Sequence, residues 1–311
     1  MQMKSVFFFI FFVTAACQAQ DTTILTSDSV QLVVKVAGQG APCIFVHGGP
    51  GGGFISFEKM GGKNLELCLT MVYYDQRGSG SSKNATDYSL NRMVQDIEEL
   101  RLQLKLDKVY LLSHSFGGII AYNYAKKYPE HVYGLILANS TLHFLNTAST
   151  KEQVEYGYHL LRKDTVIRET DSLLQIMTAV RKEMSKQRIG YKFLTDDIQT
   201  IIKLDSLDEQ YPRTNDFGMA IVVPLLDTSK KVIYPEYSKD YTAETANLRI
   251  PVLTITGTND HAIGIHHYEL FKFPQQEVVK IDGGHLLYFE QNEAFVKAIC
   301  KFIKKKTWKQ K

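Results

Sequence analysis

The sequence predicts an α/β fold, in which a mostly parallel β-sheet has helices on both faces and carries a helical insertion. Three observations indicate this. Short apolar runs typical of buried strands alternate with segments whose apolar residues recur at helical spacing. These strand signals stop between about residues 141 and 249, where apolar pairs lie among many charges. The length of 311 residues suits one such domain with an insertion.

Each expected strand is a short apolar or β-branched run. The first two runs are separated by Gly38-Gln39-Gly40, which predicts a turn and therefore a hairpin. In chain order the expected strands are residues 30–36, 43–46, 69–74, 109–112, 132–137, 252–255 and 278–281.

Three helices are expected around these strands. Apolar residues recur every three or four positions from about residue 89 to 105, and again over 119–128 and 295–303. The domain organisation follows from this order. Residues 21–140 and 250–311 would form the α/β core, and residues 141–249 would form a helical insertion within it.

Composition and charge exclude several classes of protein. The chain is 44% hydrophobic and 22% charged, as in ordinary globular proteins. Its net charge of +3 comes from the ends, because Lys4 and six lysines after residue 300 account for 7 of the 36 basic residues. Residues 21–300 then hold 29 basic and 33 acidic side chains, a balance of −4. Such a body has no basic face to neutralise phosphates, so nucleic acid is not expected as a partner.

Residues 1–20 are expected to be an export signal. Lys4 precedes an apolar run over residues 6–13, which is too short to span a bilayer, and small residues follow it. The expected location is the periplasm or cell envelope. Two processed forms are open: cleavage after Ala19 gives a soluble protein, and cleavage before Cys17 gives a lipid-anchored one. Thr14 stands where lipoprotein signals usually have leucine, which favours the soluble form.

The number and spacing of the cysteines do not indicate a disulfide framework. After the signal, Cys43, Cys68 and Cys300 remain, and no C-x-x-C pair occurs. We therefore expect no disulfide that the fold depends on and no cysteine metal site, with Cys43 buried in its strand.

The sharpest local motif is Ser113-His114-Ser115-Phe116-Gly117-Gly118, at a predicted strand-to-helix junction. A serine there, with glycine two residues later, is typical of a strained turn that exposes a nucleophilic hydroxyl. Ser113 takes the place of the usual first glycine and is small enough for the turn. Alternatively, Ser115 only caps the following helix.

A serine nucleophile needs a base and an acid that orients the base, and in this layout they follow in the order acid, then histidine. Asp260 comes after the strand at 252–255, and His285 after the strand at 278–281. Ser115, Asp260 and His285 are therefore the candidate catalytic residues. Asp282 is the rival acid, but its place three residues before His285 favours a role in ending its own strand.

Other histidines have competing interpretations. His261, His266 and His267 crowd the loop after Asp260, but their spacing matches no familiar zinc pattern, so neither metal nor cofactor is expected. His114 is expected to point away from the turn into the packed core.

A glycine-rich loop, His47-Gly48-Gly49-Pro50-Gly51-Gly52-Gly53, directly follows the strand at 43–46. Glycines let backbone amides approach a ligand closely, so one N–H here and that of Phe116 would hold a developing oxyanion. The loop lacks the lysine of a Walker motif, which argues against nucleotide binding.

Together these motifs make the sequence resemble the α/β-hydrolase superfamily, and within it the proline-iminopeptidase-like branch of serine peptidases. The resemblance covers about residues 30–304. It is carried by His47-Gly48-Gly49-Pro50-Gly51, by Asp75-Gln76-Arg77-Gly78-Ser79-Gly80-Ser81, and by the ordered Ser115, Asp260 and His285.

The resemblance implies a Ser-His-Asp acyl-transfer mechanism without a cofactor, and a helical cap over residues 141–249 that selects substrate. It implies that Gly49 and Phe116 supply the oxyanion amides, and that Asp75 and Arg77 support loops. The expected activity is an exported aminopeptidase that cleaves N-terminal residues, including proline, from short peptides.

Two departures from those peptidases keep other activities open. They have tryptophan after the nucleophile, where this chain has Phe116, and a cap Trp-Glu motif, whereas the single tryptophan here is Trp308. The alternatives are a carboxylesterase or lactonase acting on small apolar acyl compounds, and a non-catalytic binding protein. The cap carboxylates available to an amino terminus are Glu152, Glu155, Glu209 and Glu236.

Overall fold

The computed structural model describes residues 20–168, 172–226 and 229–307. The expected export signal, residues 1–20, lies outside the described residues except for its last position. Trp308 also lies outside them. Within the described part of the chain, no helix is both long enough and apolar enough to cross a membrane.

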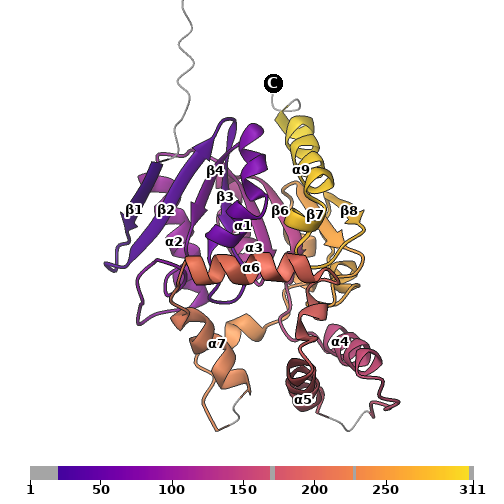
Figure 1. The fold of residues 1–311 in the computed structure, drawn as a ribbon. Helices are drawn as coiled ribbons and strands as arrows, with labels where there is room; N and C mark the ends of the chain where they lie inside the picture. The colour runs from indigo at the N-terminus through magenta and orange to yellow at the C-terminus, as the bar shows by residue number, and fades with distance from the viewer. Residues whose placement is uncertain (1–19, 169–171, 227–228, 308–311) are drawn as a thin grey trace, which may run out of the picture.

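One eight-stranded sheet organises the chain, in the order β1-β2-β4-β3-β5-β6-β7-β8 (Figure 1). Strands β3 to β8 are parallel, while β1 and β2 form an antiparallel edge. The predicted α/β fold with a mostly parallel sheet is confirmed. The strands are β1 (Gln20–Leu25), β2 (Gln31–Gly38), β3 (Ala41–Val46), β4 (Leu69–Tyr74), β5 (Val109–Ser115), β6 (Val132–Ser140), β7 (Val252–Gly257) and β8 (Gln276–Ile281).

The hairpin predicted for residues 30–36 and 43–46, which are β2 and β3 of the structure, is wrong. Strand β4 lies between β2 and β3 and pairs with both, antiparallel to the first and parallel to the second. Residues 43–46 are buried throughout, which suits the middle of a parallel sheet rather than an edge hairpin. Gly38 makes the crossing possible: with φ of 91°, it passes so close to β4 that an added Cβ would lie 2.4 Å from the Leu69 carbonyl oxygen.

Helices cover both faces of the sheet, as expected. On one face, α2 (Leu90–Gln103) and α3 (Gly117–Lys127) pack over alternate strand residues such as Ile44. On the other face, α1 (Phe54–Lys59) and α9 (Asn292–Thr307) pack over the intervening residues such as Phe45. The Ser89 side chain caps α2 by accepting a hydrogen bond from the Arg92 amide. The remaining short helices are α8 (Leu287–Glu290) and the 3₁₀ turns η1 (Gly62–Leu67), η2 (Pro129–His131), η3 (Gly190–Phe193), η4 (Pro235–Ser238), η5 (Ala243–Asn247) and η6 (His267–Leu270).

Between β6 and β7, the described residues form four α-helices and three of the 3₁₀ turns. Helices α4 (Thr147–Leu160) and α5 (Leu173–Lys186) pack on each other around a small apolar cluster of their own. Helices α6 (Ile198–Gln210) and α7 (Asp216–Leu226) instead contribute side chains to the two main clusters beside the sheet. In the view of Figure 1, α4, α5 and α7 gather below the sheet and α6 crosses its front.

A disulfide joins Cys68 to Cys300, a pair that the cysteine spacing did not indicate; that the fold does not depend on it stays a prediction. Cys68 follows η1, and Cys300 lies on α9, which packs over the same end of the sheet. The two cysteines are 232 positions apart, so their proximity comes from the tertiary fold and leaves no sign in local spacing. Cys43 is free and buried, as expected.

Candidate active site

Ser115 occupies a strained turn between β5 and α3. Its φ of 54° lies in the left-handed region, which residues other than glycine rarely adopt. The surrounding backbone is tightly packed: a Cβ on Gly117 would lie 2.3 Å from the Val46 carbonyl oxygen, and one on Gly48 would lie 2.7 Å from Ser115 Cβ. Glycine at both positions therefore lets α3 and the glycine-rich loop close around the serine.

His285 and Asp260 lie in direct contact, on the loops after β8 and β7. The His285 Nδ1 is 2.9 Å and 3.0 Å from the two carboxylate oxygens of Asp260. Burial acts to raise the pKa of Asp260, but the adjacent His285 outweighs it and lowers that pKa below its ordinary value. The carboxylate is thus ionised and accepts the Nδ1 proton, which leaves the lone pair on Nε2.

Asp282, the rival acid, takes part in a different set of contacts. Its carboxylate accepts hydrogen bonds from Thr258 Oγ1 at 3.1 Å and Asn259 Nδ2 at 3.2 Å. Asp282 therefore joins the loops after β7 and β8. The carboxylate in contact with His285 is that of Asp260.

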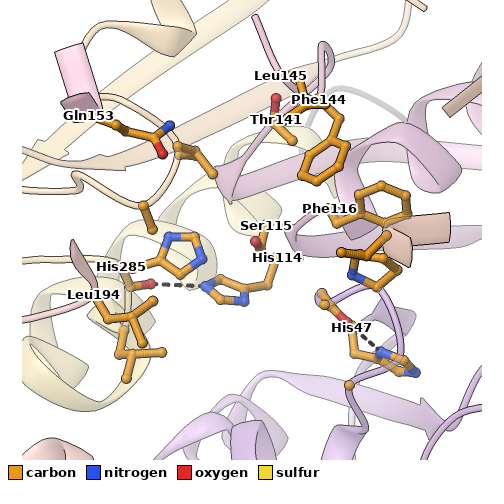
Figure 2. Close-up of a pocket in the computed structure, with 18 of the residues that line it drawn as sticks. His47, His114, Ser115, Phe116, Thr141, Phe144, Leu145, Gln153, Leu194 and His285 are labelled. Atoms are coloured by element: carbon orange, nitrogen blue, oxygen red, sulfur yellow. Dashed lines mark hydrogen bonds between the residues drawn. The ribbon is translucent and has the colours of Figure 1, made fainter. Parts of the chain in front are cut away.

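Ser115 and His285 line one cavity of about 600 Å³ (Figure 2). Gly48, Gly49 and Phe116 border the same space. No hydrogen bond joins Ser115 Oγ to His285 among the contacts of the described residues, and such bonds are often long before substrate binds. The serine, the histidine and both expected oxyanion residues therefore face one volume.

The glycine-rich loop is held from below by His47. The His47 Nε2 accepts a hydrogen bond from the Gln76 amide at 2.9 Å, and its Nδ1 lies 2.9 Å from the Gly48 carbonyl oxygen. Burial lowers the pKa of His47 to about 4, so the ring is neutral and Nδ1 donates. His47 shapes this loop.

Asp75 and Arg77 have the supporting contacts that were expected of them. The Asp75 carboxylate accepts hydrogen bonds from the amides of Phe54 and Ser81, at 2.9 Å and 2.8 Å. The fully buried Arg77 bonds to the carboxylates of Asp28 and Asp96. These contacts fix the start of α1, which directly follows the glycine-rich loop, and tie Arg77 to the turn after β1 and to α2.

His114 does not point away from the site, and that expectation is wrong. Its ring centroid lies 4.5 Å from that of His285, and its Nε2 lies 2.9 Å from the His285 carbonyl oxygen (Figure 2). Burial lowers the pKa of His114 to about 3, so the ring is neutral and Nε2 donates. The turn places His114 under the loop of His285 because β5 and β8 deliver both to the same end of the sheet.

Asn139, at the end of β6, is a residue that sequence reasoning missed. Its Nδ2 donates to the carbonyl oxygens of Gly284 and His285, and its Oδ1 accepts a 2.7 Å hydrogen bond from the Gly257 amide. One buried side chain therefore ties the loop of Asp260 to that of His285. Its φ of 43° is the only local sign of this position, and no sequence pattern shows it.

The three histidines after Asp260 have separate partners. His261 Nδ1 lies 2.6 Å from Glu152, His266 Nδ1 lies 3.1 Å from Glu269, and His267 Nδ1 faces the Gly264 carbonyl. Within the described residues, no three His, Cys, Asp or Glu side chains come together in a way that would hold a metal ion.

The expected cap glutamates do not reach the cavity. Glu152 bonds to His261, and Glu236 accepts a hydrogen bond from the Leu90 amide at 3.0 Å. Glu155 and Glu209 are exposed. Among the described wall residues the one carboxylate is Asp208, on α6, which sequence reasoning did not single out.

Comparison with known protein families matches residues 42–291 to the family described as having the alpha/beta hydrolase fold. The chain belongs to the α/β-hydrolase family. This hydrolase is 29% identical over 286 residues to a proline iminopeptidase of Lactobacillus delbrueckii subsp. bulgaricus, covering 87% of this chain and 92% of the relative. It is 26% identical over 291 residues to a Bacillus subtilis (strain 168) protein provisionally named 2-succinyl-6-hydroxy-2,4-cyclohexadiene-1-carboxylate synthase, covering 90% and 97%.

The fold of this hydrolase matches that of a proline iminopeptidase-related protein from Thermus thermophilus. The TM-score is 0.71 at 20% sequence identity, over 92% of this chain and 98% of the other. The expected superfamily and its proline-iminopeptidase-like branch are confirmed. The names of these relatives state different activities. Membership of the family therefore shows that this protein is a hydrolase but does not define its substrate.

Proposed function

We propose that this protein is a serine hydrolase that transfers an acyl group to Ser115. The observation that carries the proposal is that His285, bonded to the buried Asp260, lines the same cavity as a serine in a strained turn. In this mechanism His285 Nε2 takes the Ser115 proton as Oγ attacks the acyl carbonyl carbon. The histidine then gives the proton to the leaving group, and water repeats the sequence to free the acid.

The developing oxyanion would be held by the backbone N–H groups of Gly49 and Phe116. Phe116 precedes the first turn of α3, where amides have no partner within the helix. Gly49, with φ of 128°, stands in a loop that only glycines allow to pass this close to Ser115. Donors of this kind act because they are already oriented when charge appears on the oxygen.

The first candidate substrate is the N-terminal residue of a short peptide. The proline iminopeptidase relative, which aligns over most of its length, supports it. An aminopeptidase needs a carboxylate to pair with the substrate's ammonium group. Asp208 is the wall residue that would serve, although it already pairs with Arg213 at 2.7 Å.

The second candidate is a small carboxylic ester, and the charge inventory of the cavity favours it. Apart from Asp208, which is occupied by Arg213, the described wall residues offer no carboxylate for an ammonium group. An ester needs no such partner, because its acyl group is recognised by apolar contacts such as those of Phe144 and Met177.

A substrate panel separates these candidates. The hydrolase is expected to react with a serine-directed fluorophosphonate. Its rates are measured in parallel on aminoacyl arylamides, on their N-acylated forms and on aryl esters. For the aminopeptidase, N-acylation should abolish cleavage, because the carboxylate would lose its ammonium partner. Equal rates on free and N-acylated arylamides would contradict the peptidase and leave the esterase. Absence of probe labelling would contradict both and favour the non-catalytic binding protein.

We also propose that the protein is exported and that its mature form begins at Gln20. Lys4, the apolar run and the small residues after it support this. The intact mass of the protein purified from its native envelope is expected to equal that of residues 20–311. A lipid-sized increment that disappears in Cys17→Ser would instead establish attachment to the membrane through Cys17. An unprocessed Met1 would contradict export.

A further inference from the structure

The described wall of the cavity carries two arginines and one aspartate, and one of the arginines has no counter-charge. Asp208 and Arg213 pair with each other at 2.7 Å. Arg181, on α5, also lines the cavity, and no described carboxylate bonds to it. The described wall therefore holds one excess positive charge, that of Arg181.

The Arg181 guanidinium is held in place by two neutral neighbours. Its Nη2 donates to Gln153 Oε1 at 3.0 Å, and its Cζ lies over the Phe193 ring, 4.7 Å from the centroid. Both neighbours belong to the packed region of α4, α5 and η3. A guanidinium has five N–H donors, and this arrangement orients the group while leaving most of them available.

Gln153 adds a second donor at the same place. Because its Oε1 accepts the bond from Arg181, the orientation of the carboxamide is set and the NH₂ must face the other way. No hydrogen-bond partner for that NH₂ is present among the described residues, and Gln153 itself lines the cavity. Figure 2 shows its carboxamide directed toward the cavity.

The surroundings make an anion favourable here. Arg181 is an exposed residue that lines the mouth of the cavity, but the protein around its guanidinium desolvates the charge and lowers its pKa. An arginine stays protonated under such conditions, so the charge is retained at a cost. Apolar wall residues such as Leu174 and Met177 strengthen any electrostatic interaction inside the cavity.

We propose that Arg181 and Gln153 together bind a carboxylate carried by the substrate, away from the bond that is cleaved. The hydrolase would then prefer half-esters of dicarboxylic acids, or other acyl compounds with a free carboxylate, over neutral or cationic ones. This inference rests on the proposed serine-hydrolase function and identifies its substrate class. A free ammonium group would be repelled by Arg181, so the inference favours the ester candidate over the aminopeptidase.

Matched aryl esters test it. The mono-p-nitrophenyl esters of succinate, glutarate and adipate are compared with neutral p-nitrophenyl esters of the same chain length. The wild-type protein is expected to show the higher kcat/KM for at least one of the acids. Arg181→Met should raise KM for that ester on the order of 10- to 100-fold, the range for a hydrogen-bonded charge, and should leave kcat and the neutral ester unchanged.

Three controls make the outcome specific. Lys182→Met removes the same charge from the next position of α5, which is also exposed but does not line the cavity, and should change neither ester. Arg181→Lys should recover only part of the affinity, because an ammonium cannot make the bidentate contact. Glutarate should slow fluorophosphonate labelling of the wild type more than that of Arg181→Met.

The possible failures are distinguishable. Equal KM changes on acidic and neutral esters in Arg181→Met, or no preference of the wild type for any acidic ester, would overturn the carboxylate site while the hydrolase stands. No cleavage of any ester and no probe labelling would overturn the hydrolase itself.

Discussion

Replacing Ser115 with alanine is expected to lower kcat by on the order of 10⁴-fold or more and to abolish fluorophosphonate labelling. The change removes the attacking oxygen. It should leave the fold intact, because the Ser115 hydroxyl has no hydrogen bond to any other described residue. Activity on the preferred ester or arylamide, probe labelling and a thermal melt of the same preparation measure the effect. Labelling retained in Ser115→Ala would move the nucleophile elsewhere and contradict the triad.

Substitutions of the other two triad residues are expected to lower activity to different degrees. His285→Ala should be about as severe as Ser115→Ala, because the serine is inactive without its base. Asp260→Asn should cost less, since the histidine remains but loses the partner that fixes its tautomer. Asp282→Asn is the matched control on the neighbouring loop, and it should have a smaller effect than Asp260→Asn. The reverse order would show that the acid has been wrongly assigned.

Replacing Arg77 with methionine is expected to destabilise the protein by about 3–5 kcal/mol, as for the loss of one partner from a buried ion pair. The guanidinium is fully buried and bonds to Asp28, to Asp96 and to the Asp87 carbonyl oxygen. Without it, the bonds left to the buried Asp96 carboxylate among the described residues are those from Arg92. Urea unfolding followed by circular dichroism gives the free energy of unfolding.

A second variant separates this loss from a simple loss of volume. In Arg77→Met combined with Asp96→Asn, the uncompensated buried charge is gone, so part of the stability should return. Lys59→Met, an exposed charge removal, should change stability by less than about 0.5 kcal/mol. An Arg77→Met variant as stable as the wild type would show that the Arg77 contacts contribute little.

The strands expected from the sequence are present in the structure. They could be predicted because most of them are apolar runs buried in the sheet, and such a run is recognised from the local sequence alone. Strand β1 was missed, since Gln20–Leu25 is largely polar and is recognised only through its pairing with β2. The hairpin failed for a related reason. The neighbour of β2 in the sheet is β4, which begins more than thirty residues further along the chain. The turn residues between β2 and β3 carry no information about that pairing.

The site divides in the same way. Ser115, Asp260 and His285 could be named because motif and chain order place them after particular strands. Asn139 could not be named, because its importance comes from bonding two loops that the sheet brings together. Arg181 was missed because it stands among Lys182 and Glu183 on an amphipathic helix, where a charge usually faces solvent. Its orientation toward the cavity is set by the packing of α5 on α4.

The disulfide gives the molecule a closed covalent ring. Cys68 and Cys300 bracket Ser115, Asp260, His285 and all of α4 to α7, so most of the cavity wall is built within one loop of chain. A protease that cuts once anywhere inside that loop therefore cannot release a fragment. The nicked enzyme would run as a single full-length band without reductant and as two shorter bands with it, and its two pieces would remain tethered while the noncovalent packing holds the site together.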